Sequence, residues 1–227
     1  MTCVIADSRR WNPDMAQRLA LRTGRRFVSI ATPQELSAER LASETAQIVF
    51  FPHWSHLIPA QIHERFECVI FHMTDLPFGR GGSPLQNLIA RGIGETKISA
   101  LRCVAERDAG PVYLKRPLTL QGSAQDIYRQ ANAIIEDMIV EILVHHPEPT
   151  PQSGEAVTFR RRRPDEGNLA GVSGVEQAYD LIRMLDADGY PPAFIEVGKL
   201  RLEFSRAQMR DGEVRADVVI RKIEHGG

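Results

Sequence analysis

One stretch of the sequence, residues 71–92 (FHMTDLPFGRGGSPLQNLIARG), concentrates residues that could do chemistry. A short apolar run precedes it, so His72 and Asp75 are expected just beyond a buried strand, at the edge where open α/β sheets bind ligands. A glycine-rich loop and a dipeptide suited to opening a helix follow: Gly79, Gly81, Gly82, Ser83 and Pro84. The glycine spacing matches neither the dinucleotide nor the P-loop pattern, so the loop alone does not identify a phosphate site.

A second stretch, residues 95–118, supplies an acidic residue. Thr96 and Ile98 alternate as in a strand, and Asp108 opens the turn Asp-Ala-Gly-Pro. An aspartate in that position most often accepts hydrogen bonds from its own turn, and this interpretation stays open. If Asp108 instead lies beside His72, its carboxylate would fix the tautomer of the imidazole and raise its basicity. The pair could then exchange a proton with a reacting amine.

These residues need a sheet to position them, and the first half of the chain predicts one. Short runs rich in Val, Ile and Phe alternate with amphipathic segments, as in α/β folds: Cys3–Ala6, Phe27–Ile30, Ile48–Phe51 and Cys68–Phe71. Apolar runs of this length are typical of strands buried on both faces of a parallel sheet. We therefore expect an α/β fold with a mostly parallel sheet.

Two helix starts are predicted from capping signals. Thr32, Pro33 and Glu35 suit a capping box in which Glu35 reaches back to the Thr32 amide. Ser123 is followed three residues later by an aspartate, and apolar residues then hold one helical face as far as about His145. This long second helix is expected to pack across the sheet.

The composition changes near residue 150. Three prolines, a serine and a glycine fall between residues 147 and 154 and predict a linker. Beyond it, one amphipathic helix and three strand-like segments are expected: residues 175–185, Phe194–Val197, Leu200–Phe204 and Val214–Ile220. We predict a main domain over residues 1–150, and a linker with a small C-terminal α+β appendage over residues 151–227. Exposed strands in this appendage would suit a homodimer contact.

Composition narrows the function classes. The 227 residues carry 28 Lys and Arg against 29 Asp and Glu, a net charge of −1, which disfavours a general DNA or RNA binder. No stretch approaches the roughly 20 apolar residues of a membrane span, and no signal-peptide pattern is present. The three cysteines are far apart and form no C-x-x-C pair, which predicts neither disulfides nor zinc and fits the cytoplasm. No metal ion is expected.

The order of these motifs resembles the formyltransferase family that uses 10-formyltetrahydrofolate, which includes methionyl-tRNA, glycinamide ribonucleotide and sugar N-formyltransferases. The resemblance covers residues 45–165. It rests on a histidine after a strand, a turn, a glycine-rich loop, a Gly-x-Thr strand, an acidic turn and an upstream loop: His72, Leu76-Pro77, Gly79–Pro84, Gly94 with Thr96, Asp108 with Gly110, and Trp54–Pro59. It implies a Rossmann-like formyltransferase domain that performs folate-dependent one-carbon transfer.

Within the family, residues 51–55, 71–89 and 108–118 are most similar to the sugar N-formyltransferases of pseudaminic-acid-type amino-sugar pathways. This likeness predicts transfer of a formyl group from 10-formyltetrahydrofolate to the primary amine of a nucleotide-linked amino sugar. Methionyl-tRNA formylation is the alternative, disfavoured because the appendage is short and carries both signs of charge, whereas tRNA recognition needs a basic extension. A catalytically decayed folate-binding protein is the third hypothesis.

The resemblance also implies roles for individual residues. His72 would move the proton at the reacting centre, and Asp108 would orient it. The folate would lie between two loops, against Trp54, Ser55, His56, Leu57, Arg102, Val104 and Glu106. The amino sugar would meet Thr74, Asp75, Arg80, Gly81, Gly82 and Arg161. Two alternatives stay open: Trp54 stacks on the pterin or packs the core, and the arginine run 160–163 clamps a diphosphate or is a solvated surface.

One position departs from the family pattern. Where the family has asparagine two residues before its histidine, this chain has Ile70, which cannot donate a hydrogen bond to an oxyanion. Losing one such donor typically costs about 10²- to 10³-fold in rate. His53 is the preferred substitute because it ends the neighbouring strand, and capping a turn is its equally weighted alternative role. Gln86 and Asn87 are weaker candidates because they lie inside a predicted helix.

Overall fold

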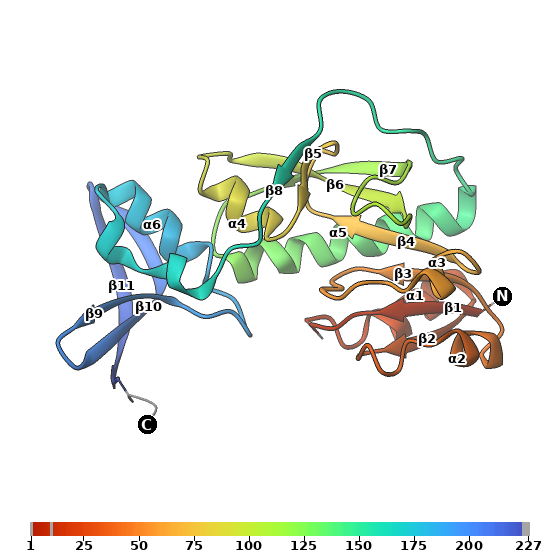
Figure 1. The fold of residues 1–227 in the computed structure, drawn as a ribbon, viewed down its shortest axis with the longest axis horizontal. Helices are drawn as coiled ribbons and strands as arrows, with labels where there is room; N and C mark the ends of the chain where they lie inside the picture. The colour runs from red at the N-terminus through yellow and green to blue at the C-terminus, as the bar shows by residue number, and fades with distance from the viewer. Residues whose placement is uncertain (1, 10, 224–227) are drawn as a thin grey trace. The chain divides into compact units, whose positions relative to one another are not determined.

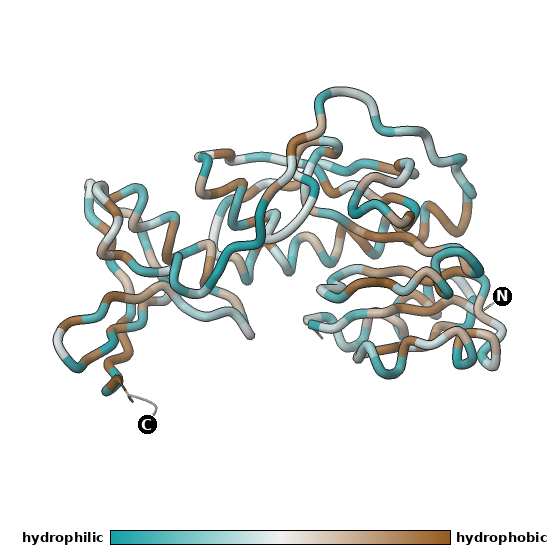
Figure 2. Tube along the Cα trace, in the orientation of Figure 1, coloured by the Kyte–Doolittle hydropathy of each residue, from teal (hydrophilic) through white to brown (hydrophobic). Residues whose placement is uncertain are grey.

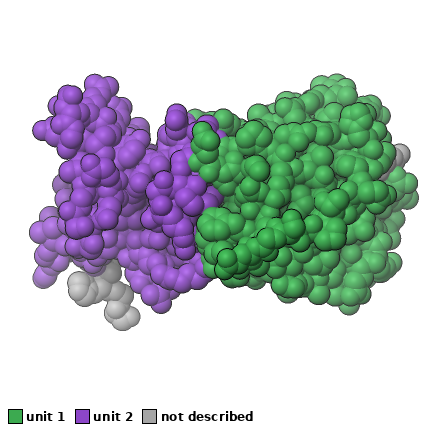
Figure 3. Space-filling view, turned by 90° about the horizontal axis from the view of Figure 1, so that it is seen from above, with its two compact units in different colours: residues 1–84, 95–118, 129–159 green, residues 85–94, 119–128, 160–227 purple. Residues whose placement is uncertain are grey.

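A computed structural model describes residues 2–9 and 11–223. The chain forms two compact units, each assembled from three separate segments (Figure 3). Unit 1 holds residues 1–84, 95–118 and 129–159, and unit 2 holds residues 85–94, 119–128 and 160–227. The composition of the sequence predicts one division at residue 150. In the structure, residues 151–159 group with unit 1, and two short earlier segments group with unit 2.

Unit 1 is built on a six-stranded sheet with the strand order β2-β1-β3-β4-β6-β7 (Figure 1). Its strands are β1 (Thr2–Ala6), β2 (Arg26–Ile30), β3 (Ala46–Phe51), β4 (Glu67–His72), β6 (Glu95–Arg102) and β7 (Val112–Thr119). β1 pairs in parallel with β2 and β3, and β3 with β4, whereas β6 runs antiparallel to β4. The four strands predicted from apolar runs are present, and the mostly parallel sheet is confirmed.

The long helix α5 (Ala124–His145) begins and ends where the sequence predicts. The Ser123 hydroxyl accepts from the Asp126 amide (3.2 Å), and the Asp126 carboxylate accepts from the Ser123 amide (3.2 Å), so the capping box is complete. Its apolar stripe is buried at Ile127, Ala131, Ile135, Met138, Ile139 and Ile142. The shorter helices of unit 1 are α1 (Met15–Thr23), α2 (Ala38–Ser43) and α3 (Ala60–His63).

The prediction of a helix that starts at Thr32 is wrong. The chain makes a turn there, and the Glu35 carboxylate accepts from the Ala31 amide (3.0 Å) instead of the Thr32 amide. The helix is α2, which begins six residues later and is capped by Ser37, whose hydroxyl accepts from the Arg40 amide (3.1 Å). Ser37 is the cap because a start at this position turns the leucine of α2 into the core.

The glycine-rich loop contains a short strand that the sequence did not predict. β5 (Phe78–Gly81) pairs in parallel with β8 (Val157–Phe159), from the end of the predicted linker. Gly81 has a φ of +104°, and a Cβ there would lie 2.3 Å from the Phe159 carbonyl oxygen, so only glycine fits. Helix α4 (Pro84–Ile89) follows, as predicted.

Unit 2 carries the predicted α+β appendage. Its antiparallel sheet has the order β11-β10-β9 and consists of β9 (Ala193–Val197), β10 (Leu200–Arg210) and β11 (Glu213–Lys222). Helix α6 (Val175–Arg183) packs against β10 and β11, and two 3-10 turns, η1 (Pro164–Gly167) and η2 (Leu169–Gly171), precede it. Among residues 2–9 and 11–223, no helix combines the length and apolarity that a bilayer span requires.

Candidate active site

His72 is the last residue of β4, and its side chain is only 8% exposed. Its Nε2 lies 2.7 Å from the carbonyl oxygen of Gly79, in β5. Because a carbonyl can only accept, Nε2 must carry a hydrogen and donate it. The other ring nitrogen, Nδ1, faces Asp108 Oδ2 at 3.8 Å. The backbone of the glycine-rich loop therefore fixes the tautomer and turns the basic nitrogen toward a carboxylate.

Asp108 lies in the turn between β6 and β7, and its side chain is 10% exposed. Its backbone adopts the left-handed region, with φ at +53°. Oδ2, the oxygen nearest the imidazole, also accepts from the Gly81 amide (2.9 Å). The turn itself is pressed against β6, because a Cβ on Gly110 would lie 1.8 Å from the Arg102 carbonyl oxygen. Asp108 therefore reaches across to the strand that holds His72 and does not simply cap its own turn.

This arrangement can accept and hold one proton. Nδ1 is the unprotonated nitrogen of the neutral ring, and the imidazolium formed on proton uptake would be stabilised by the carboxylate beside it. Low exposure of both side chains strengthens that attraction relative to water. The hypothesis that His72 and Asp108 meet in space agrees with this geometry.

Gln152 belongs to the same site. Its position in the predicted linker gave no sign of this role. Its side-chain amide donates to the backbone carbonyls of Asp108 (2.8 Å) and Gly110 (2.9 Å). Its Oε1 accepts from Arg80 Nη2 at 2.8 Å. Gln152 thus ties the acidic turn to the glycine-rich loop. The only sequence signal was a long amide side chain among small and cyclic residues, which is too general to identify it.

The segment after His72 is held mainly by residues from β6 and β7. Thr74 is fully buried, and its carbonyl accepts from the Ser99 hydroxyl (2.7 Å). Asp75 pairs with Lys115 (2.6 Å) and Lys97 (2.9 Å). Burial raises the pKa of Asp75, but hydrogen bonds from the two lysines outweigh it and leave that pKa below its usual value. Thr74 and Asp75, expected to meet the acceptor, are engaged in supporting the loop.

The other predicted acceptor-contacting residues divide between the two units. Arg80 donates to Gln152 and pairs with Glu106 (3.2 Å). Arg80 was predicted to contact the acceptor and Glu106 the folate, so these two predicted contact residues lie beside each other. Gly82 donates its amide to the Phe159 carbonyl (3.1 Å) and continues the β5–β8 contact. Arg161 is exposed and belongs to unit 2, whereas His72 belongs to unit 1.

The loop after β3 has a buried donor with nothing to donate to. Trp54 Nε1 has no hydrogen-bond acceptor among the described residues, and its ring contacts Phe51 and His56 edge-on. Ser55 approaches Ser8, and Leu57 is 78% exposed. A buried unpaired N–H costs free energy unless a ligand accepts it. The indole ring packs against the core cluster that includes Phe51, Ile58 and Ile62, which is the core-packing role left open for Trp54.

His53 ends the neighbouring strand in a different environment. Its Nε2 lies 2.7 Å from Asn132 Oδ1 on α5, and its ring contacts Trp11 edge-on. Burial lowers the pKa of His53, although the charge of Asp7 and the hydrogen bond to Asn132 oppose this. Ile70, the residue that replaces the family asparagine, packs among Leu76, Leu101 and Val112.

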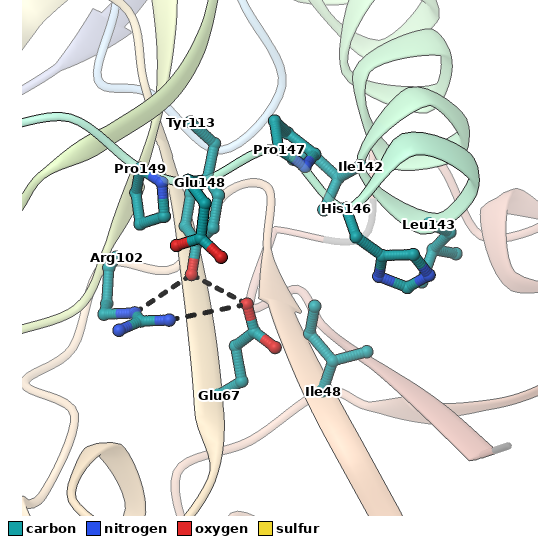
Figure 4. A pocket seen from close by; sticks show the side chains of 10 residues that line it. All are labelled: Ile48, Glu67, Arg102, Tyr113, Ile142, Leu143, His146, Pro147, Glu148 and Pro149. Carbon is teal, nitrogen blue, oxygen red and sulfur yellow. Dashed lines mark hydrogen bonds and ion pairs between the residues drawn. The ribbon is translucent and has the colours of Figure 1, made fainter.

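Arg102 lines a cavity of about 190 Å³ bounded by β3, β4, β6, β7 and the end of α5 (Figure 4). Its Nε donates to the Tyr113 hydroxyl (3.0 Å), which donates to Glu67 (2.7 Å). Burial and the bond to Glu67 raise the pKa of Tyr113 to about 12, so the phenol keeps its proton. Glu67 is the first residue of β4 and His72 is the last, so they lie roughly 16 Å apart at strand spacing. This cavity is therefore at the opposite end of β4 from His72. The residues predicted to contact the folate therefore do not lie in one place. Val104 is 36% exposed on the turn, whereas Arg102 faces this cavity.

Comparisons with known proteins identify the relatives of this chain. The family described as "methionyl-tRNA formyltransferase, C-terminal domain" matches residues 164–221. Methionyl-tRNA formyltransferase of Dechloromonas aromatica is 26% identical over 156 residues, 66% of this chain and 51% of that protein. The same enzyme of Methylobacterium nodulans is 24% identical over 225 residues, 92% of this chain and 71% of that protein. The chain spans about half the length of the first curated relatives it matches.

Solved structures extend the comparison. HypX from Aquifex aeolicus, in complex with tetrahydrofolic acid, has a TM-score of 0.74 at 18% identity and covers 93% of this chain and 39% of HypX. A sugar N-formyltransferase from a Shewanella species has a TM-score of 0.68 at 13% identity over 99% of both chains. These two share the fold.

The methionyl-tRNA formyltransferase from Clostridium thermocellum has a TM-score of 0.95 and covers 98% of this chain and 99% of its own. The predicted family, fold class and enzyme class are confirmed by these matches, whereas the likeness to sugar enzymes extends only to the fold. At 47% identity across nearly the whole of both chains, this chain belongs to the formyltransferase family, in its methionyl-tRNA formyltransferase-like group.

Proposed function

We propose that this chain transfers a formyl group from 10-formyltetrahydrofolate to a primary amine. The observation that carries the proposal is the His72–Asp108 pair, with Nδ1 turned toward the carboxylate at 3.8 Å and Nε2 bound to a backbone carbonyl. The donor supplies an activated formyl group on nitrogen. The loop of residues 54–57 and the turn around Asp108 are the segments that would hold it.

The residues of the chain divide the work of proton transfer. His72 Nδ1 takes the proton that the amine loses as it attacks the formyl carbon. It passes that proton to N10 of the folate as the bond between N10 and the formyl carbon breaks and tetrahydrofolate leaves. Asp108 Oδ2 stabilises the resulting imidazolium and keeps the ring facing the reaction, since the Gly81 amide fixes that oxygen. Proton transfer of this kind contributes about 10²- to 10⁴-fold, and alignment of the two reactants contributes more. We assign this chemistry to unit 1, which contains His72, Asp108 and the supporting Gln152.

The leading acceptor is the aminoacyl end of methionyl-tRNA. This assignment rests on the 47% identity to the Clostridium thermocellum enzyme of that name over 98% of this chain. The three short sequence motifs instead favoured a nucleotide-linked amino sugar. We reverse that preference because similarity over the whole chain weighs more than similarity over three short segments.

A nucleotide-linked amino sugar is the second candidate, favoured by the charges of the appendage. Residues 160–223 hold 12 basic and 11 acidic side chains, and many of the arginines are bound to neighbouring carboxylates. Such pairs include Arg160–Glu166 (2.5 Å), Arg201–Glu196 (3.0 Å) and Arg206 with Asp217. Arginines already paired are poor phosphate ligands, so this surface suits a small acceptor better than a polyanion.

We further propose that His53 supplies the oxyanion contact that Ile70 cannot make. The family asparagine donates a hydrogen bond, so His53 must donate through Nδ1. This requires the Asn132 amide to present its N–H₂ to Nε2, which is the reverse of the orientation in the structure, where Oδ1 lies 2.7 Å from Nε2. The reaction belongs to the cytoplasm, since the three cysteines are free and buried.

The deciding experiment offers 10-formyltetrahydrofolate with each acceptor separately: methionyl-tRNA, and a panel of nucleotide amino sugars. Release of tetrahydrofolate and mass of the product are followed. Formylated methionyl-tRNA with no sugar turnover supports the leading acceptor, and the opposite result replaces it with the second. Binding of tetrahydrofolate without turnover of any acceptor identifies a decayed folate-binding protein and overturns the catalytic proposal.

A further inference from the structure

The three-stranded sheet of unit 2 has two unlike faces. In its register, Leu202 of β10 lies opposite Ile195 of β9 and Ile220 of β11. The same alternation holds from Leu200 to Ser205, after which the register of β10 against β11 shifts. Because neighbouring residues of a strand point to opposite faces, these pairings sort the side chains without ambiguity.

One face, which we call the charged face, is covered by ion pairs. It carries Phe194 and Glu196 of β9, Arg201 and Glu203 of β10, and Arg221 of β11. Phe194 is buried, and the Arg201 guanidinium lies 3.5 Å from its ring centre. Arg201 pairs with Glu196 (3.0 Å) and Glu203 (3.3 Å), and Arg221 pairs with Glu203 (3.0 Å). Val219 is the one aliphatic residue that β11 contributes to this part of the face, opposite Glu203. A face of this kind is suited to water.

The other face, which we call the apolar face, consists of Ile195 and Val197 of β9, Leu200, Leu202 and Phe204 of β10, and Val218 and Ile220 of β11. Four of its side chains stay exposed although α6 packs against β10 and β11: Val197 is 59% exposed, Leu200 45%, Val218 45% and Ile220 61%. Figure 2 shows the hydrophobic stretch in β11 just before the carboxyl end of the chain. Contiguous apolar surface of this kind marks a site of association.

We propose that the apolar face is the docking surface for a second copy of this chain. Its seven members carry no charge, so two copies can meet about a two-fold axis without bringing like charges together. A nucleic acid or an anionic membrane surface would need basic side chains there, and Lys222, at the corner beside Leu200, is the single cation in the register of this face. The charged face lacks this self-complementarity, because its own ion pairs already use its charges.

The area sets the strength of the contact. The four exposed side chains present roughly 350 Å² of apolar surface, comparable with the largest patch of an ordinary monomer. Two copies would bury about 700–1,000 Å² in total, at the low end of specific interfaces. We therefore expect a dimer that forms with rising concentration and dissociates on dilution, independently of the acceptor that the active site uses.

The test compares two substitutions at adjacent positions of β11. Ile220→Glu places a carboxylate on the apolar face, whereas Val219→Glu places the same group on the charged face. Sedimentation velocity and light scattering from about 1 to 300 μM measure the oligomeric state, and circular dichroism with thermal unfolding checks that both variants fold. Val219 is 48% exposed and Ile220 is 61% exposed, so the two sites are similarly accessible.

The unmodified chain and Val219→Glu should both dimerise over this concentration range, and Ile220→Glu should stay monomeric, with an apparent Kd raised at least about tenfold. A milder variant, Leu200→Gln, should weaken the dimer less and guards against misfolding of the glutamate variant. An unmodified chain that is monomeric throughout would overturn the proposal, as would equal dimerisation of both glutamate variants. Loss of the dimer in Val219→Glu alone would move the contact to the charged face.

Discussion

The ends of β3 and β4, two neighbouring parallel strands, each carry a histidine, and the two histidines make nearly the same first hydrogen bond. Nε2 of His72 lies 2.7 Å from the Gly79 carbonyl, and Nε2 of His53 lies 2.7 Å from Asn132 Oδ1. They differ in what the second ring nitrogen meets. Nδ1 of His72 faces a carboxylate at 3.8 Å, whereas burial dominates at His53 and lowers its pKa. The same side chain therefore faces a carboxylate at one strand end, whereas at the other it is held where burial disfavours its charged form.

The largest expected effect comes from removing the proton acceptor. His72→Ala should lower kcat by about 10³-fold or more, because general base catalysis supplies about 10²- to 10⁴-fold. Steady-state release of tetrahydrofolate measures the rate, and thermal unfolding confirms the fold. His53→Ala removes the proposed oxyanion donor and should lower kcat by about 10²-fold, a smaller loss than that of His72→Ala. If His72→Ala kept near-normal turnover, the proton role would belong elsewhere.

Removing the charge beside His72 should have the next largest effect. Asp108→Asn keeps an oxygen that can accept from the Gly81 amide but cannot stabilise an imidazolium. We expect kcat to fall about 10²-fold, because the imidazolium loses its counter-charge. A near-normal kcat in this variant would contradict the assigned role. Asp75→Asn, in the lysine-paired site, serves as the control carboxylate.

This pair also marks how far the sequence could predict the site. His72 and Asp108 were recognisable because each follows a strand and matches a motif of ordered spacing. Gln152 was not, because its contacts with Asp108 and Gly110 join residues 44 and 42 positions apart through the folding of an irregular segment. No local pattern encodes such a contact. The pairing of β5 with β8 was missed for the same reason.

The fold was more accessible than its details. Buried strands and the long helix have strong periodicity, so they were predicted within a residue or two. The error at Thr32 arose because two adjacent segments both carry capping residues, and only packing of the helix against the core decides between them. The acceptor was misjudged because the distinction depends on similarity along the whole chain, which three short motifs represent poorly.

Gln152 tests whether the placement of Asp108 matters separately from its charge. Gln152→Ala removes both bonds to the acidic turn and the bond to Arg80. We expect kcat to fall about tenfold with little change in the KM for either substrate, since misplacement of a catalytic group costs rate even when its chemistry is intact. Gln152→Glu should not rescue it, because a carboxylate cannot donate to the two carbonyls. A pure loss of stability at constant kcat would reduce Gln152 to a structural residue.

The smallest effect sharpens the other side of the comparison. Because burial lowers the pKa of His53 below its ordinary value of 6.5, the unfolded chain binds a proton there at pH values at which the folded chain does not. This contribution is fully present above pH 6.5 and is lost as the pH falls below it. Its slope reaches at most about 1.4 kcal/mol per pH unit for one proton. His53→Gln, whose side-chain amide can still form a hydrogen bond with Asn132, should therefore show a shallower decrease in unfolding free energy than the unmodified chain between pH 6.5 and 5, as measured by urea denaturation. Parallel curves of unfolding free energy against pH would mean that His53 titrates alike in the folded and unfolded chain. Burial would then not distinguish His53 from His72, and the contrast between the two strand ends would be lost.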